Sequence, residues 1–268
     1  MPNKKTPAPV ISVIIPTYNG ARFIAQTVES VLTQTVGELE IIIVDDNSDE
    51  QTKKVLAEII KNTKRVLVIP SSPDGLNVGP GPSRNLGVQT AKAPLIALID
   101  DDDLWLAKDK LELQITYLNT HPECVLVGTA DNDIIDETGK LLIHYHNPVT
   151  DSEIRHTALL RNPFINSSVV FRKETFSHVG GFKDMRLAED YDLWLRMAKF
   201  GRVANIQHNL NPQPLTAYRR RPSSVSSQKK KAMAGAILAI VKRYRKDFPL
   251  SLLGLAKAYV RLFVIHFQ

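Results

Sequence analysis

The sequence predicts an α/β fold in which a mostly parallel sheet carries helices on both faces. Two observations support this prediction. Apolar runs rich in Val and Ile alternate with stretches of helical pattern along the first half of the chain. These runs are continuous, as in strands that are buried on both faces, and polar residues follow directly after them. A chain of 268 residues with 43% hydrophobic residues can bury such a core.

The elements of this first half, about residues 10–120, are expected in regular order. Strands are predicted at VISVIIP (10–16), ELEIIIVDD (38–46), RVLVIP (65–70) and PLIALIDDDD (94–103), and helices near 21–33, 50–61, 83–90 and from about 108. Strands separated by helices of this length indicate βαβ units and therefore a Rossmann-like half. Ligands of such sheets bind beyond the carboxyl ends of the strands, so the polar residues there should converge on one edge.

The most acidic part of that edge is the run Asp100–Asp103 after the fourth strand. Neighbouring carboxylates raise one another's pKa unless a cation or the donors of a ligand keep them ionised, so we expect a positive group beside them. The alternative is a solvated loop that starts the next helix, since aspartate favours helix N-termini. Thr17, Tyr18 and Asp46 follow the first two strands, and Arg84 lies near the start of a helix, where it could contact a phosphate or a base.

The second half, about residues 121–225, has a different pattern. Short strands and turns are expected in CVLVGTA (124–130), NDIIDETGKLLIHYH (132–146, with a hairpin turn at 137–139), NSSVVFRKETF (166–176) and GGF (180–182). This pattern predicts a mixed region beside the parallel sheet. A helix is predicted in RLAEDYDLWLRMAKFG (186–201), where Leu187, Tyr191, Leu195 and Ala198 recur at helical spacing and Gly201 supplies a stop.

The charge is unevenly distributed along the chain. The formal net charge is +6, yet residues 216–268 contain twelve Lys or Arg and one acidic residue, Asp247. No aromatic stacking pattern or nucleic-acid-binding motif accompanies these basic residues, so we expect no nucleic-acid partner. Cys124 is alone in the sequence, which rules out an internal disulfide. The start, MPNKKTPAP, lacks the apolar stretch of a signal peptide, and the apolar run 232–241 is too short to span a bilayer, so we expect a cytoplasmic protein.

The tail, residues 226–268, is predicted to form basic amphipathic helices. Apolar residues fall on one helical face at Ile237, Val241, Tyr244 and Phe248, and on another at Leu252, Leu255, Tyr259, Phe263 and Phe267, with Lys242, Arg243, Lys246, Lys257 and Arg261 beside them. Helices of this kind either pack on the domain or on another copy of the chain, or lie peripherally on an anionic membrane. The sequence leaves both alternatives open.

Six motifs occur in a fixed order along the chain. They are PTYNG (16–20), VDDNSDE (44–50), PSRNLG (82–87), LIDDDDLW (98–105) with KLELQ after it, INSSVVFRK (165–173) and AEDYDLWLRMAKFG (188–201). Together they resemble the family 2 glycosyltransferases of the GT-A fold, over roughly residues 10–225. The resemblance implies a glycosyltransferase domain in residues 1–225 that moves a sugar from a nucleoside-diphosphate sugar to a hydroxyl acceptor, glycan, lipid-linked or other, with inversion. Such enzymes serve polysaccharide or glycoconjugate synthesis.

The resemblance also implies roles for single residues on the donor side. Asp100 and Asp102 would hold the sugar nucleotide, Asp102 through a divalent Mn²⁺ or Mg²⁺ ion that bridges the diphosphate, with Asp101 and Asp103 beside them. The nucleobase and phosphate contacts would come from Pro16, Thr17, Tyr18, Asp46 and Arg84. Asp46 as an acceptor suits the N3–H of uracil or thymine, which favours a uridine diphosphate sugar, although guanine could also offer an N–H to it.

On the acceptor side, the resemblance assigns Asp190 as the general base. Glu189 or Asp192 would orient the acceptor or complement the helix dipole, and Asn166 falls in the region expected to contact the acceptor. The chain departs from the family where relatives often carry Tyr-Arg-x-His, because it has AYRRRPSSVS (217–226). Arg219, Arg220 or Arg221 would then contact the diphosphate in place of the histidine.

Three other functions are compatible with parts of the pattern. A receiver-type signalling domain would share IIIVDDNS and Asp100, but the strand before the acidic pair and the large mixed region argue against it. A sugar nucleotidyltransferase would carry a Gly-rich loop with Arg and Lys after the first strand, where this chain has PTYNGARF. A catalytically silent relative would bind the nucleotide without turnover.

Overall fold

A computed structural model describes residues 8–208, 213–222, 224 and 228–266. Within these residues the larger sheet contains β1 (Ile11–Thr17), β2 (Leu39–Asp45), β3 (Val66–Pro70), β4 (Leu95–Leu98), β6 (Cys124–Thr129), β9 (Val170–Arg172) and β10 (Arg202–Ile206). Its strand order is β10-β6-β9-β4-β1-β2-β3. Of the described strands in this larger sheet, only β9 runs antiparallel to its neighbours, which are β4 and β6. The prediction of a mostly parallel sheet is therefore confirmed.

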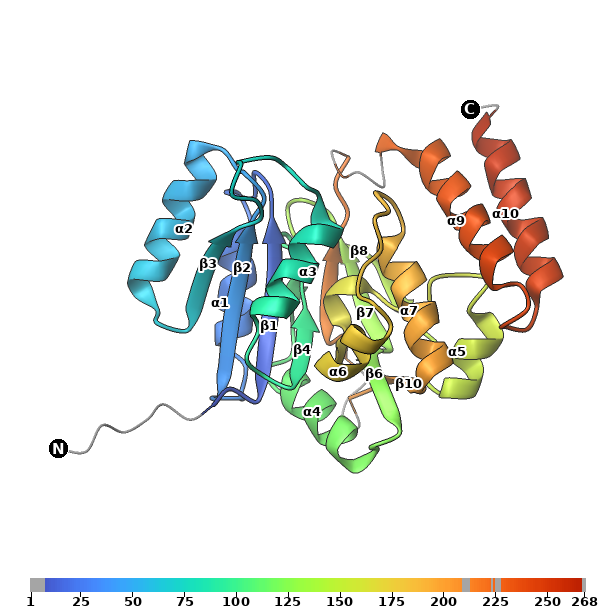
Figure 1. Cartoon of the computed structure of the whole chain (residues 1–268), viewed down its shortest axis with the longest axis horizontal. Coiled ribbons are helices and arrows are strands. Elements are labelled where there is room, and N and C mark those ends of the chain that lie inside the picture. Colours follow the sequence, from blue (N-terminus) through green and yellow to red (C-terminus); the bar gives the residue numbers. More distant parts are fainter. Residues whose placement is uncertain (1–7, 209–212, 223, 225–227, 267–268) are drawn as a thin grey trace.

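A smaller sheet and the helices complete the described chain (Figure 1). The second sheet has the order β5-β11-β7-β8, formed by β5 (Leu104–Trp105), β11 (Thr216–Arg219), β7 (Asp131–Ile135) and β8 (Leu141–His146). The helices are α1 (Ile24–Leu32), α2 (Glu50–Asn62), α3 (Pro80–Thr90), α4 (Lys110–Thr120), α5 (Asp151–Thr157), α6 (Lys173–His178), α7 (Glu189–Phe200), α9 (Lys230–Tyr244) and α10 (Ser251–His266), with a 3₁₀ turn at Asn166–Ser168. The predicted hairpin is confirmed, because β7 and β8 pair antiparallel.

Side chains of the central strands alternate between two apolar cores. Val13 and Ile15 point into a core shared with α1, α2 and α4, whereas Ile14 points into a core shared with α3 and α7. This alternation is what a strand with both faces buried requires, since successive side chains point to opposite faces. The predicted helices on both faces of the sheet are therefore present.

The strand register brings the polar residues to one edge. β1 pairs with β2 from Ile11 opposite Leu39 to Thr17 opposite Asp45, so both strands end at the same level. β4 pairs with β1 on the other side and ends just before Asp100. The predicted convergence of the polar residues on the carboxyl edge is therefore confirmed.

Several elements of the second half differ from the sequence-based expectation. Only Val170–Arg172 of the run 166–176 is a strand, because a 3₁₀ turn precedes it and α6 follows it. Helix α5 was not expected, although its start carries a capping box in which Thr150 and Glu153 bond each other's backbone N–H. Helix α7 begins after Ala188, whose φ of +57° breaks the helical pattern.

The tail divides into two parts with different environments. Val241, Tyr244 and Phe248 of the α9 region are buried in the same core as α7, and Ile237 is partly buried against it. Helix α10 packs beside α9 at the end of the molecule opposite α2 (Figure 1). Phe267 and the expected boundary at 225–226 lie outside the described residues. In the part of the chain that the structure describes, no helix combines the length and apolarity needed to cross a membrane.

Two helical glycines allow a test of how closely α3 packs on the sheet. A Cβ at Gly87 would overlap the Cγ2 of buried Ile14 and lie 3.2 Å from Val44, whereas a Cβ at Gly235 in α9 would meet no atom within 4 Å. We expect Gly87→Ala to lower the free energy of unfolding by about 1–3 kcal/mol through overpacking. Gly235→Ala should instead raise it by about 0.5–1 kcal/mol, because alanine favours the helix. Denaturant unfolding measures both, and equal changes would contradict the packing described.

Candidate active site

The aspartate run begins where β4 ends, and its first carboxylate is held by two donors. Asp100 Oδ1 accepts hydrogen bonds from Arg84 Nη2 (2.6 Å) and Asn166 Nδ2 (2.9 Å). The backbone N–H of Asp100 donates to Ser167 Oγ at 2.9 Å. Asn166 and Ser167 come from the 3₁₀ turn before β9, so the antiparallel strand brings this turn to the aspartate run.

Asp101 points toward the end of β1. The hydroxyl of buried Thr17 donates to Asp101 Oδ2 at 2.5 Å. Burial and the neighbouring charges of Asp102 and Asp100 raise the pKa of Asp101 to about 7, although the Thr17 hydrogen bond opposes this shift. Gly20 is required beside this pair, because a Cβ there would overlap both the Asp101 carboxylate and the Thr17 hydroxyl.

Asp102 and Asp103 turn toward the C-terminal strand β11. Arg221 Nε lies 2.5 Å from Asp102 Oδ2, and burial raises the pKa of Asp102 despite this opposite charge. Asp103 is completely buried, accepts the Ser167 hydroxyl and takes the backbone N–H of Arg219 at 2.7 Å. Burial and the charges of Asp102 and Asp100 raise its pKa well above the ordinary value. Asp103 therefore anchors β11 to the aspartate run.

The three consecutive arginines have different environments. Arg219 is buried, donates to the carbonyls of Asp102 (2.7 Å) and Asp136 (3.2 Å), and lies 4.6 Å from the centroid of the Phe23 ring. Arg220 is exposed, and its backbone N–H bonds the adjacent strand. Among the three, Arg221 is the one whose side chain pairs with a carboxylate of the run. The sequence left this choice open.

A single buried guanidinium joins the two halves of the site. Arg84 Nη2 bonds Asp100 at 2.6 Å and Arg84 Nη1 bonds Glu189 at 2.9 Å. Burial alone would lower the pKa of Arg84, but the charges of Asp100 and Glu189 raise it, so the group is permanently charged. Its guanidinium also lies 5.5 Å from the ring centroid of Phe182. The start of α7 is thereby fixed relative to the end of β4.

Asp190 follows Glu189 but has a different partner. Its Oδ2 accepts a hydrogen bond from the neutral amide of Asn162 at 3.0 Å. Burial and the negative charge of Glu189 raise the pKa of Asp190 to about 6. A carboxylate with such a pKa is a stronger proton acceptor than an ordinary aspartate and still ionises at neutral pH.

Other predicted site residues lie elsewhere. The carboxylate of Asp192 is turned to α9, where it accepts from Arg243 (2.7 Å) and Tyr244 (2.9 Å), and it also bonds Arg196 on its own helix. The structure therefore does not bring Asp192 to the other acids, and its carboxylate holds α7 and α9 together. Pro16 is buried inside β1, opposite Val44. It contributes to the sheet rather than to the exposed edge.

Tyr18 and Asp46 line the other side of the edge. Tyr18 is 55% exposed. Asp46 is buried and accepts three hydrogen bonds, from Ser71 Oγ (2.5 Å) and Val78 N (2.9 Å) on Oδ1, and from Gly79 N (2.8 Å) on Oδ2. A carboxylate has about four lone-pair sites, so one site on Oδ2 has no donor among the described hydrogen bonds. Asp46 therefore holds the loop before α3 in place.

The carboxylate oxygens of the aspartate run could coordinate a divalent ion only together with further oxygen atoms from a ligand. In the described residues, no three His, Cys, Asp or Glu side chains gather into a ready metal centre. Mg²⁺ is commonly held by one or two carboxylates together with substrate phosphates, which matches Asp102 with its neighbours. Burial, and after it the charges of the neighbouring aspartates, raises the pKa values of Asp101, Asp102 and Asp103, so a bound cation would favour their ionised forms.

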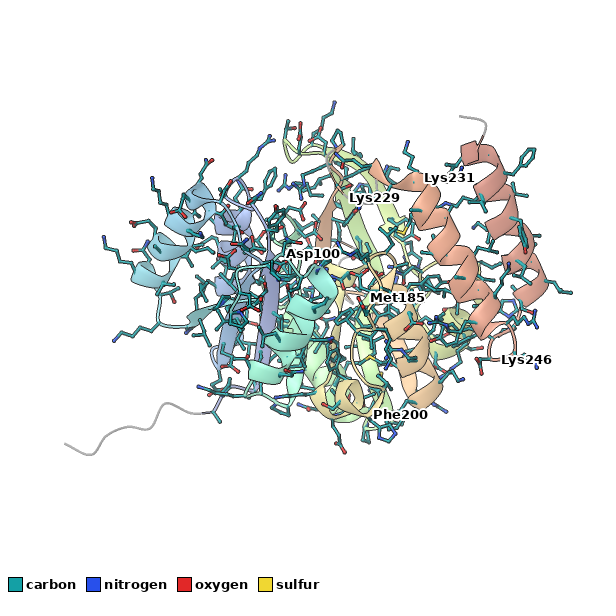
Figure 2. All side chains as sticks on the ribbon, turned by 45° about the horizontal axis from the view of Figure 1, so that its top comes forward. Asp100, Met185, Phe200, Lys229, Lys231 and Lys246 are labelled. Atoms are coloured by element: carbon teal, nitrogen blue, oxygen red, sulfur yellow. The ribbon has the colours of Figure 1, made fainter. Side chains whose placement is uncertain are left out.

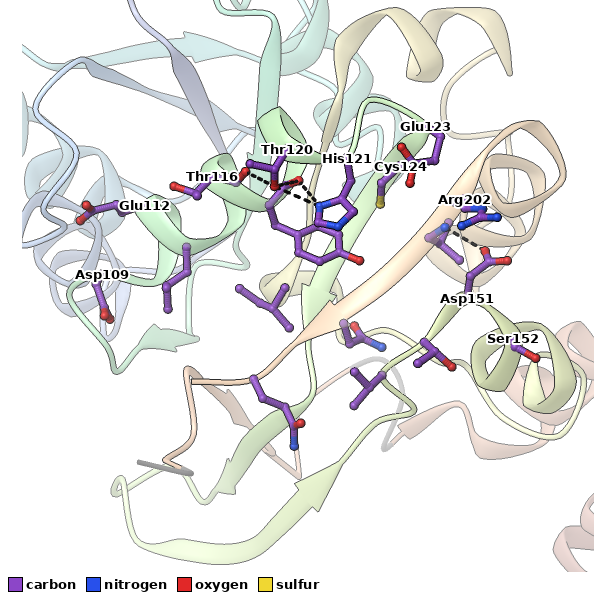
Figure 3. Close-up of a pocket in the computed structure, with 18 residues that line it drawn as sticks. Asp109, Glu112, Thr116, Thr120, His121, Glu123, Cys124, Asp151, Ser152 and Arg202 are labelled. Atoms are coloured by element: carbon purple, nitrogen blue, oxygen red, sulfur yellow. Dashed lines mark hydrogen bonds between the residues drawn. The ribbon is translucent and has the colours of Figure 1, made fainter. Parts of the chain in front are cut away.

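Two cavities of the described chain lie away from these acids. One cavity of about 960 Å³ lies between α4, β10 and the start of α5 (Figure 3), and another of about 950 Å³ lies near Pro9 and Lys92. Tyr117 and His121 stack in the first at a centroid distance of 4.2 Å. Neither cavity is lined by the aspartate run, by Arg84 or by Glu189 and Asp190.

Comparison with known proteins agrees with this arrangement. Residues 12–182 match the family described as glycosyl transferase family 2. The chain belongs to this family. It is 33% identical over 200 residues to the amylovoran biosynthesis glycosyltransferase AmsE of Erwinia amylovora, covering 74% of this chain and 73% of that protein. It is 31% identical over 225 residues to the putative teichuronic acid biosynthesis glycosyltransferase TuaG of Bacillus subtilis, covering 84% of each.

Solved structures share the fold of this glycosyltransferase. S. aureus TarS 1–349 in complex with UDP-GlcNAc matches with a TM-score of 0.66 and 19% identity, over 95% of this chain and 72% of that one. The mannosyltransferase PcManGT from Pyrobaculum calidifontis, in complex with GDP-Man and Mn²⁺, matches with a TM-score of 0.66 and 17% identity, over 97% and 76%. The GT-A fold implied by the motifs is confirmed, and the receiver and nucleotidyltransferase alternatives are not favoured.

Some residues of the site were not expected from the sequence. Phe23, beneath Arg219 and Arg221, and Asn162, beside Asp190, lie outside every motif, so no local signal could have identified them. Ser167 lies inside INSSVVFRK, but only the structure shows that its hydroxyl connects Asp100 and Asp103.

The bridge through Arg84 predicts a large loss of stability on its removal. Arg84→Met leaves two largely buried carboxylates without their cation, so we expect the free energy of unfolding to fall by about 3–5 kcal/mol. Arg22→Met is the matched control, because Arg22 pairs with Glu137 (3.2 Å) on the exposed surface, and its loss should cost less than about 1 kcal/mol. Denaturant unfolding of both variants checks this. Equal decreases in the free energy of unfolding of the two variants would contradict the stabilising role of the Arg84 bridge.

Proposed function

We propose that this glycosyltransferase moves a sugar from a uridine diphosphate sugar to an acceptor hydroxyl with inversion at the anomeric carbon, in the synthesis of a surface polysaccharide or related glycan. The observation that carries the proposal is the Arg84 bridge between Asp100 and Glu189. It holds Asp190, the proposed base, in a fixed position relative to the aspartate run that would receive the donor diphosphate. The names of the relatives in amylovoran and teichuronic acid biosynthesis support the class of product.

The chemistry is a direct displacement. The acceptor oxygen attacks the anomeric carbon while its proton passes to a carboxylate oxygen of Asp190. The bond from the anomeric carbon to the diphosphate oxygen breaks on the opposite face, so the configuration inverts. Asp190 suits this role better than Glu189, because Glu189 is engaged as an anion by Arg84 whereas Asp190 contacts only a neutral amide among the hydrogen bonds described.

Departure of the nucleoside diphosphate builds negative charge that the site must stabilise. Asp102, with Asp100 and Asp101 beside it, would hold a divalent Mn²⁺ or Mg²⁺ ion, which would neutralise diphosphate oxygens when bound. Arg221 lies at the same carboxylate and would donate to the phosphate oxygens. Arg219 would keep this part of the strand in place through its carbonyl contacts.

The choice of uridine follows from the hydrogen-bonding capacity of Asp46. One lone-pair site remains on its Oδ2 after the bonds to Ser71, Val78 and Gly79. The single N3–H of uracil needs one acceptor site. The Watson–Crick edge of guanine presents N1–H and N2–H₂ side by side, and both would need acceptors, so uracil suits Asp46 better.

The role of Asp190 predicts a specific kinetic change. Asp190→Asn should lower kcat by about 10²–10⁴-fold, which is the usual contribution of general base catalysis, while the affinity for the donor stays close to that of the parent. In the parent, kcat/KM should fall about tenfold per pH unit below pH about 6, because protonation of Asp190 in the free enzyme removes the base, and should level off above it. Steady-state kinetics against pH, with donor affinity measured separately, check both.

Exposed Asp184, in the loop before α7, provides the control, and Asp184→Asn should leave the rate and its pH profile unchanged. Nuclear magnetic resonance of the product should show the anomeric configuration reversed. A retained configuration, or full activity of Asp190→Asn, would refute the mechanism.

Nucleotide binding tests the donor side. Calorimetry should show tighter binding of UDP than of GDP, and a chelator or Asp102→Ala should weaken UDP binding at least about tenfold. Arg221→Gln should weaken it by about 10–100-fold, the contribution of a charged hydrogen bond, because Arg221 would donate to the diphosphate in the proposed complex. Arg220→Gln removes the same charge from the neighbouring exposed position and should have little effect.

Each of these binding measurements has a result that would contradict the proposal. Preferential binding of GDP would refute the uridine assignment. Unchanged UDP affinity in chelator would refute the divalent ion, and equal effects of the two arginine substitutions would refute the assignment of Arg221.

A further inference from the structure

Helix α10 carries a continuous apolar face on the outside of the molecule. Its exposed residues include Leu252 (82% exposed), Leu253 (56%), Tyr259 (50%), Val260 (62%), Phe263 (66%) and Val264 (47%). At 100° per residue these positions fall within one sector of the helix. Helix α10 is the outermost element at this end of the molecule, beyond α9 (Figure 1). An apolar face of this extent on the surface indicates an interaction site.

Contacts with the domain fix which side of α10 faces outward. A Cβ at Gly254 would lie 2.7 Å from the carbonyl oxygen of Leu159, so the helix backbone packs closely on the domain there. Ala258, one turn later, is buried, and Leu255 packs against the core that includes α7 and α9. The small residues therefore form the inner side, and rotation of the helix to bury the apolar face would lose this fit.

Basic side chains border the apolar face. Lys257 and Arg261 are exposed on α10 itself, and Lys242 Nζ of α9 lies 5.1 Å from the ring centroid of Tyr259. Residues 251–266 contain no acidic residue. Asp247, the nearest acid in the sequence, is paired with Lys199 at 2.7 Å. Figure 2 shows Lys229 and Lys231 near one end of α9 and Lys246 near the other, so positive charge extends along this side.

We propose that α10 lies on the surface of a bilayer that contains anionic lipid, with its apolar face at the boundary of the acyl chains and its basic residues among the headgroups. This inference goes beyond the transferase activity. An apolar face with Lys and Arg at its margin is the composition of a helix that lies in the plane of the interface. At about 24 Å, from 1.5 Å per residue, α10 is shorter than a transmembrane helix, and it does not meet the requirements of a membrane span.

Charge distinguishes a lipid surface from a second copy of the chain. If two α10 faces paired around a twofold axis, Lys242, Lys257 and Arg261 of one copy would lie close to the same residues of the other copy. The repulsion between these positive charges would destabilise such a dimer. Anionic headgroups would instead neutralise these rows. Basic residues near an anionic membrane surface are attracted to it. The net charge of the tail therefore favours the lipid surface.

The test is co-sedimentation of the full chain with vesicles of phosphatidylcholine and phosphatidylglycerol, compared with vesicles of phosphatidylcholine alone. The parent should bind the anionic vesicles at low salt and bind them much less at ~1 M salt, where charges are screened beyond ~3 Å. The triple variant Leu252→Gln, Leu253→Gln, Val260→Gln should bind at least about tenfold more weakly, since glutamine keeps the helix propensity but removes the apolar surface. Lys257→Gln with Arg261→Gln should reduce the preference for anionic vesicles.

A matched control keeps the result specific to α10. Ile60→Gln, Leu67→Gln and Leu142→Gln remove three exposed apolar side chains from α2, β3 and β8, and this variant should bind as the parent does. Circular dichroism and thermal unfolding verify that each variant is folded. Failure of the parent to sediment with anionic vesicles, or equal binding of the α10 variant and the control variant, would overturn the proposal. Dimerisation in sedimentation velocity that the α10 variant abolishes would assign the face to a second copy and likewise overturn it.

Discussion

The structure depends on one buried guanidinium. Arg84 lies at the start of α3 and is held between Asp100 at the end of β4 and Glu189 at the start of α7. A buried charge is tolerated only when opposite charges compensate it, so these three residues require one another. Through them the Rossmann-like half and the mixed half of the chain meet at a defined distance, and Asp190 takes its position from its neighbour Glu189.

The aspartate run assigns a different task to each of its carboxylates. Asp100 takes part in the Arg84 bridge, Asp101 is held by Thr17, and Asp103 is buried as the anchor of β11. Asp102 pairs with Arg221, and it is the carboxylate that we propose to hold the divalent ion. The four carboxyl groups remain close together because hydrogen bonds and arginines from other elements surround them. Burial and mutual repulsion together raise the pKa values of Asp101, Asp102 and Asp103.

The two tail helices have similar amphipathic sequences but lie in different environments. Tyr244 of α9 is buried in the core and donates a hydrogen bond to the carboxylate of Asp192 in α7. From the motif alone, this carboxylate was a candidate for contact with the acceptor. Helix α10 packs through Gly254 and Ala258 and leaves its larger apolar residues outside. The domain core therefore extends into the tail, and within the described part of the tail the exposed large apolar residues lie on α10.

The sequence by itself determined the class of sheet, the order of the first strands and helices, the family, and the run of acids at the carboxyl edge, because apolar periodicity and ordered motifs are local properties. The tertiary structure decided which acids face the site. It turned Asp192 toward α9, buried Pro16 in the sheet, engaged Asp46 with three loop donors, and paired Arg221 with Asp102. It also supplied Phe23 and Asn162, which no motif contains. These outcomes depend on contacts between residues far apart in the chain, and such contacts follow from the packing of whole elements rather than from neighbouring residues.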